Sequence, residues 1–174
     1  MILKIETKRR FCIVTGRSSV KDIITESFIE LLKEKSIDDI SIYELADFAK
    51  VGRVSFYRNF RDKEDILRYY ITTVTEKWLN SRKIRYLANG RTQELVVFLL
   101  KHLYEYREFF SLLMRDGRMY LLEAEFDKRI RAELADSSNP WHIAFTIGGF
   151  YKLFCYWAET GYEKTPQEIA EYVK

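Results

Sequence analysis

A short stretch that begins at Ser41 limits the possible folds of this sequence more than any other. Ser41 and Glu44 have the spacing of a capping box, so a helix is expected to begin there. Residues 50–52 break the helical pattern after about two turns. A second short helix follows, with Phe56 and Phe60 one turn apart on its buried side. Two short helices joined by a three-residue turn predict a helix-turn-helix.

Charge is unevenly distributed around this stretch. Residues 22–49 carry eight acids against two lysines, a net charge of −6, whereas residues 50–63 carry five basic residues against one acid, a net charge of +4. A basic second helix suits the phosphates of DNA, although a solvated basic helix face is the simpler alternative. The residues expected to contact DNA in the major groove or along the backbone are Ser41, Tyr43, Lys50, Arg53, Val54, Ser55, Tyr57, Arg58, Asn59 and Lys63.

This stretch resembles the DNA-binding domain of the TetR family of bacterial transcriptional regulators. The family's usual run is close to Ala-Gly-Val-Ser-x-Gly-Thr-Phe-Tyr-x-x-Phe-x-x-Lys-Glu. Departures from it are Lys50 for the turn glycine, Gly52 for the capping serine and Val54 for a second glycine. The residues at corresponding places are Ala49, Val51, Arg53, Ser55, Phe56, Tyr57, Phe60, Lys63 and Glu64.

A second resemblance lies near the C-terminal end. There the residues follow the Gly-Gly, Trp, Gly, Ser/Thr-Pro-x-Glu spacing of one TetR subgroup common in Firmicutes. The resemblance implies a homodimer on a palindromic operator and a small-molecule effector bound between the helices of the body. The residues that carry this spacing are Gly148, Gly149, Trp157, Gly161 and Pro166.

Composition predicts that the rest of the chain is helical as well. Of 174 residues, 47% are hydrophobic and 16% aromatic, while only two prolines and seven glycines interrupt the helical spacing. We therefore expect an all-α protein with a flexible basic tail (1–17), a three-helix DNA-binding domain (18–65) and a helical effector-binding and dimerisation domain (66–174). The tail could instead form a minor-groove arm. No signal peptide or transmembrane segment is recognised, so a cytoplasmic location is expected.

Aromatic and soft side chains gather in the first half of the expected body. They form either an effector pocket or an aromatic-rich core, and for His102 alone a hydrogen-bonded core position is favoured. The resemblance favours the pocket for the set as a whole. The candidate pocket residues are Trp78, Phe98, His102, Tyr106, Phe109, Phe110, Met114 and Tyr120.

Two adjacent glycines, Gly148 and Gly149, lie inside an expected helix, where each costs about 1 kcal/mol relative to alanine. A close helix crossing would explain them, either within one chain or between two subunits. The resemblance implies a four-helix bundle between subunits, and a helix-turn-helix usually needs two half-sites, so we expect a dimer. The expected interface residues are Phe145, Gly148, Gly149 and Lys152.

Signals for an enzyme are weak, because the sequence has no glycine-rich phosphate loop and no His or Cys cluster with metal spacing. We therefore expect no catalytic residues, no metal site and no cofactor. The function expected is a DNA-binding transcriptional regulator, a repressor that a small molecule releases from its operator. A transcriptional activator and a helical adaptor that has lost DNA binding are the alternatives.

Overall fold

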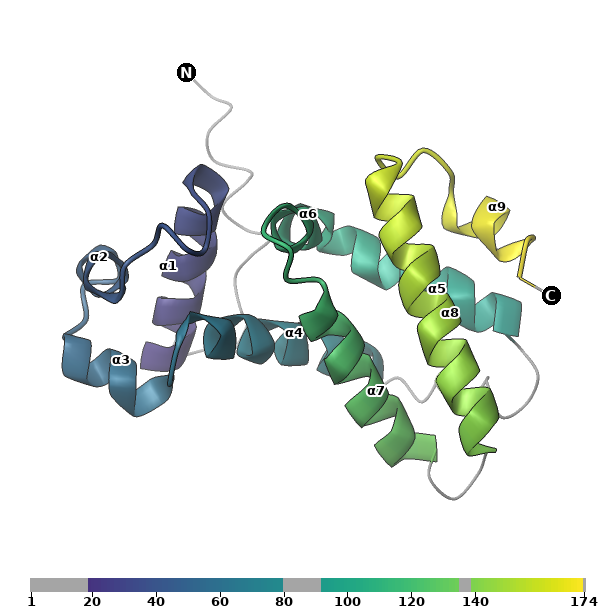
Figure 1. Ribbon diagram of the computed structural model, residues 1–174, viewed down its shortest axis with the longest axis horizontal. Helices are drawn as coiled ribbons and strands as arrows, with labels where there is room; N and C mark the ends of the chain where they lie inside the picture. Colours follow the sequence, from purple (N-terminus) through teal and green to yellow (C-terminus); the bar gives the residue numbers. More distant parts are fainter. Residues whose placement is uncertain (1–18, 80–91, 135–138, 174) are drawn as a thin grey trace. The chain divides into compact units, whose positions relative to one another are not determined.

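The computed structural model describes residues 19–79, 92–134 and 139–173, and these residues contain helices and no strand (Figure 1). The expectation of an all-α fold is confirmed. The chain divides between Leu67 and Arg68 into two compact units, which are described separately here. The helices are α1 (Val20–Glu34), α2 (Ile42–Phe48), α3 (Arg53–Asn59), α4 (Lys63–Leu79), α5 (Thr92–Glu105), α6 (Arg107–Arg115), α7 (Tyr120–Leu134), α8 (Pro140–Glu159) and α9 (Pro166–Ala170).

The first unit contains α1, α2, α3 and the start of α4. Helix α1 packs against both α2 and α3, which also pack against each other. Their apolar faces meet in a core in which Phe28, Leu45 and Phe56 are fully buried. Burial of such large side chains, each worth about 1.5–3 kcal/mol, holds two helices that would be too short to be stable alone.

Side-chain caps define where the first two helices begin. The Ser19 hydroxyl accepts the Asp22 N–H, and the Asp22 carboxylate accepts the Ser19 N–H, which completes a capping box at α1. At α2 only half of the predicted box forms. The Ser41 hydroxyl accepts the Glu44 N–H at 3.1 Å, whereas the Glu44 carboxylate pairs with Lys35.

The partner of Glu44 corrects the capping-box prediction at α2, and the reason is tertiary. The loop after α1 brings an ammonium group to this carboxylate, and a charged donor is stronger than a backbone N–H. The same hydrogen bond raises the pKa of the Lys35 ammonium above its ordinary value.

The second unit is built around two helix pairs, α7 with α8 and α5 with α9, and α6 also contacts α8. Rings fill its interior: the centroids of Tyr70 and Phe109 are 4.6 Å apart, and those of Phe110 and Phe154 are 5.2 Å apart. Phe126 from α7 adds a further buried ring, 5.7 Å from Phe150. Aromatic contacts therefore join several helices of this unit, beside buried aliphatic side chains such as Leu100 and Leu122.

Some sequence expectations lie outside the described residues. The expected tail, residues 1–17, is one of them, and the side chain of Trp78 is another. Within the described part of the chain, none of the helices combines the length and the apolar character needed to cross a bilayer.

Candidate nucleic-acid interface

Helix α3 separates a buried aromatic side from an exposed basic side. Phe56 is fully buried on the inner side of this helix. On the other side Val54 is 64% exposed and Tyr57 is 55% exposed, and both Arg53 and Arg58 are exposed. We call these last four residues the outer face of α3. It offers two guanidinium groups, a phenol and an isopropyl group to a partner.

The turn before α3 depends on an unusual backbone conformation at Lys50, whose φ is +54°. The Lys50 N–H donates to Asp47 O at 3.1 Å, and the next N–H donates to Ala46 O at 3.0 Å. This pair of bonds is the Schellman motif, which ends helices with a left-handed residue that is usually glycine. The same motif ends α6 and α8, where the left-handed residues are Gly117 and Gly161.

Lysine at this position therefore costs free energy that glycine would not, about 1–2 kcal/mol. The contacts of the Lys50 ammonium group with the described residues offset little of this free energy. The lysine side chain is highly exposed, and its ion pair with Asp47, which is also highly exposed, is 3.7 Å long. Exposed pairs of this kind contribute little to stability.

Other predicted DNA-contact residues lie around the outer face. Ser41 and Tyr43 are exposed at the start of α2, where backbone N–H groups and a phenol can meet a phosphate. Ser55 is half-buried, and so is Asn59, whose amide donates to Ser55 O at 2.7 Å. That bond orients the Asn59 amide toward its own helix.

Lys63 departs from the sequence expectation. It was expected to remain free for a phosphate, but its ammonium group donates to the carbonyl oxygens of Ile40 at 2.8 Å, of Asp38 at 3.4 Å and of Ile37. An ammonium has three donors, and three carbonyl groups of the α1–α2 loop receive them. Lys63 therefore ties the start of α4 to that loop. The expectation was wrong because it considered only the helix start and not the loop folded against it.

The eight predicted pocket residues occupy different environments. Phe109 and Phe110 are fully buried and contact other rings, so they belong to the core. The His102 imidazole contacts Val74 O through Nε2 at 2.9 Å, and its ring lies 5.4 Å from that of Tyr106. The core position favoured for His102 agrees with this hydrogen bond. Met114 is half-buried.

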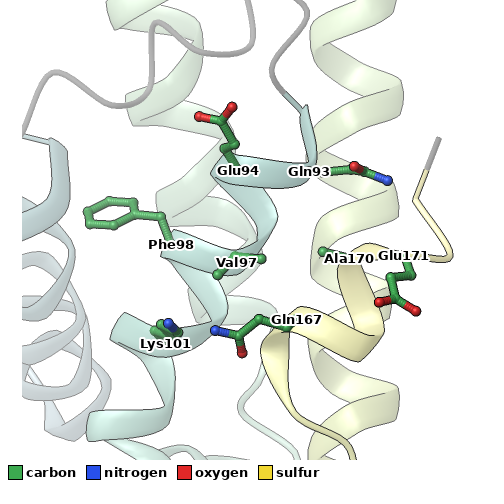
Figure 2. Close-up of a pocket in the computed structure, with 8 residues that line it drawn as sticks. All are labelled: Gln93, Glu94, Val97, Phe98, Lys101, Gln167, Ala170 and Glu171. Carbon is green, nitrogen blue, oxygen red and sulfur yellow. The ribbon is translucent and has the colours of Figure 1, made fainter.

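The two remaining described members of the predicted pocket line two separate surface hollows. Tyr120 lines a groove between α7 and α8. Phe98 lines a shallow groove between α5 and α9, shared with Lys101 and Gln167 (Figure 2). In that view the Phe98 ring points away from α9 rather than toward Gln167. The described residues thus do not bring the predicted set around one space.

The predicted dimer residues share one face of α8. Phe145 is 80% exposed, and Gly149 and Lys152 are exposed as well, whereas Gly148 is half-buried. A Cβ atom built on either glycine would have nothing within 4 Å. Among the described residues, the alternative of a crossing within one chain is therefore not observed.

Sequence reasoning missed two aromatic residues on this face. Trp141 is 83% exposed and Tyr156 is also exposed. The signal was present, because residues 141, 145, 148, 152 and 156 recur at three- and four-residue intervals and so line one side of a helix. Three exposed rings on one side of a helix favour an interaction surface there.

The structure also explains the C-terminal sequence pattern. The Trp157 indole donates to Lys164 O at 2.7 Å, which closes the loop between α8 and α9. Gly161 supplies the left-handed residue at the end of α8. Thr165 and Glu168 form a capping box at α9, and hydrogen bonds from Thr165 lower the pKa of the Glu168 carboxyl. The pattern therefore describes a helix end, a loop and a helix start.

Comparison with known proteins assigns the first unit. Residues 24–70 match the family model described as bacterial regulatory proteins, tetR family. Two relatives come from Bacillus subtilis (strain 168), and both are described as uncharacterized HTH-type transcriptional regulators. YxbF is 24% identical over 161 residues, or 86% of this chain, and YuxN is 24% identical over 126 residues, or 70% of this chain. The chain spans 42% of the length of each.

Among solved structures, the chain is similar to the dihydroxyacetone kinase operon activator DhaS. The similarity covers 88% of this chain and 90% of that chain with a TM-score of 0.50 and 15% identity, so it concerns the fold alone. The matched residues 24–70 contain α2, α3 and the outer face of α3. The helix-turn-helix of this chain is therefore of the type found in bacterial regulatory proteins of the tetR family.

Proposed function

We propose that this protein acts in the cytoplasm as a transcriptional regulator that binds operator DNA through the outer face of α3. The observation that carries the proposal is the exposure of Arg53, Val54, Tyr57 and Arg58 opposite the buried Phe56, within a TetR-type domain. A short helix with this arrangement suits the major groove. Arginine can donate two hydrogen bonds to guanine, and an isopropyl group can contact the thymine methyl.

Salt dependence of duplex binding tests this proposal. The affinity of the full-length protein for a mixed-sequence duplex should fall linearly with salt on a double logarithmic plot, with a slope of about −0.9 per phosphate contacted. Arg53→Ala should lower affinity. Arg115→Ala is a matched control, because Arg115 is exposed but lies on α6, where it pairs with Asp116 at 2.7 Å. Salt-independent or absent binding would favour the adaptor instead.

The proposed regulator works as a homodimer through α7 and α8. Support comes from the exposed side of α8, where Trp141, Phe145 and Tyr156 follow one line and the two glycines leave space for another backbone. A twofold dimer would present two α3 helices to a palindromic operator. Sedimentation of the wild-type protein at micromolar concentration tests this, and a monomer there would contradict it.

The proposed regulator represses transcription, and a small-molecule effector relieves the repression. Activation is the second candidate, and the name of DhaS, an operon activator, is the observation that favours it. A reporter placed behind the bound promoter distinguishes the two, because deletion of a repressor raises expression and deletion of an activator lowers it. If the effector weakens the binding of the protein to operator DNA, operator DNA must weaken the binding of the protein to the effector by the same factor.

A further inference from the structure

A cavity of about 350 Å³ lies between α5, α8 and the C-terminal turn after α9. None of the described residues of the predicted effector pocket is among its lining residues. Leu95 and Leu99 of α5 and Phe150 of α8 form its buried floor. Thr146 and Tyr172 contribute to its more exposed part. Its volume is at the small end of the range for ligand sites, about 300–1,000 Å³.

The walls of this cavity are supported from outside. The Phe150 ring packs against Phe126 of α7, with 5.7 Å between the centroids, so the floor cannot easily collapse into the space. The C-terminal turn is anchored by buried Ile169, whose carbonyl accepts the Tyr172 N–H at 3.1 Å. Lys164 places its ammonium group 5.4 Å from the centre of the Tyr172 ring. The wall on this side is thereby held in position.

The lining also limits the chemistry of an occupant. It contains no Asp, Glu, Lys or Arg among the described residues, and most of it is aliphatic or aromatic. A charged ligand would lose water there without gaining an opposite charge, which is costly. The polar side-chain groups are the Thr146 hydroxyl, the His142 imidazole and the Tyr172 phenol. They can satisfy one or two hydrogen-bonding groups of a mainly apolar molecule.

We propose that this cavity binds an uncharged, mainly apolar small molecule and is the effector site of the regulator. The role of the cavity as an effector site rests on the proposed function, whereas the binding of a small molecule in it does not. Phe145 and Gly149, two residues of the proposed dimer face, also line the cavity. In the proposed dimer a second subunit would border the cavity on this side.

Two fluorescent probes with closely similar ring systems test the proposal on the full-length protein. N-phenylnaphthylamine is neutral, and anilinonaphthalene sulfonate carries a negative charge. The neutral probe should bind saturably with one site per chain and a blue-shifted emission. The sulfonate should bind at least about tenfold more weakly, because its charge finds no partner in the lining.

A pair of variants locates the bound probe. Thr146→Phe places a ring in the cavity and should weaken binding of the neutral probe at least about tenfold. Ala144→Phe is the matched control, because Ala144 lies two residues away on the same helix but lines the separate groove between α7 and α8. It should leave probe binding unchanged. Val173→Trp fills the cavity from the terminal turn and replaces Thr146→Phe if that variant does not fold.

Three results would overturn the proposal. The folded wild-type protein could fail to bind the neutral probe, or it could bind both probes equally. The two phenylalanine variants could also lose binding to the same extent, which would place the probe elsewhere. None of these measurements uses DNA. A protein that binds the probe but no duplex would therefore refute the proposed function and leave the cavity proposal standing.

Discussion

Replacing Lys63 with methionine tests whether this lysine supports the fold or contacts DNA. Methionine keeps much of the side-chain length but removes the ammonium group that donates to Ile37 O, Asp38 O and Ile40 O. The Ile37 and Ile40 hydrogen bonds are part-buried, whereas the bond to Asp38 is exposed. Loss of a charged donor to a part-buried carbonyl costs about 1–3 kcal/mol. We therefore expect the first unit to lose about 2–4 kcal/mol of stability.

Urea unfolding followed by far-UV circular dichroism measures that loss. All three tryptophans, at positions 78, 141 and 157, lie in the second unit, so tryptophan fluorescence follows that unit. The fluorescence midpoint should move less than the dichroism midpoint. Lys33→Met is the control, because Lys33 pairs with Glu30 in a largely exposed position and should contribute less than about 1 kcal/mol.

The salt dependence of duplex binding by Lys63→Met tests whether the Lys63 ammonium is bound to the loop or to a phosphate. Under conditions where the variant is folded, its salt slope should equal that of the wild type, because the ammonium is occupied by the loop. A slope lowered by about one unit, together with unchanged stability, would show that Lys63 contacts a phosphate and not the loop.

Four further substitutions test other parts of the structure. Lys50→Gly should stabilise the first unit by about 1 kcal/mol, because it removes the left-handed lysine, and this is measured by the urea midpoint. The same change should weaken duplex binding and lower its salt slope by about one unit, and an unchanged slope would argue against a phosphate contact. Gly149→Leu should leave the chain folded, because its new side chain meets no atom within 4 Å of Cβ, but should convert the dimer to monomer in sedimentation; a persistent dimer would exclude a close crossing at this residue. Val54→Gly should relax a thymine preference in sequences selected from a random pool, and Arg58→Ala should cost about 1–3 kcal/mol at one guanine; identical preferences of the wild type and Val54→Gly would show that Val54 does not face a base.

Local sequence signals predicted the helices well, because the interactions that start and end a helix join residues close in sequence. Ser19, Ser41 and Thr165 cap the helices that follow them, as their hydroxyls accept N–H groups three residues ahead. The buried position of Phe56 and the exposure of Val54 likewise follow from helical periodicity alone. These features were enough to identify the helix-turn-helix and to propose its outer face.

Tertiary structure decided which chemically suitable side chains remain available. An ammonium at a helix start can meet a phosphate, but the loop before α2 supplies three carbonyls to Lys63. Phe109 and Phe110 could have lined a pocket, yet both are fully buried and each contacts a ring from another helix. The sequence determined the helices and the basic helix-turn-helix, because both depend on neighbours along the chain. Only the tertiary structure decided which aromatic residues are core and where a cavity lies, because those depend on contacts between helices far apart in sequence.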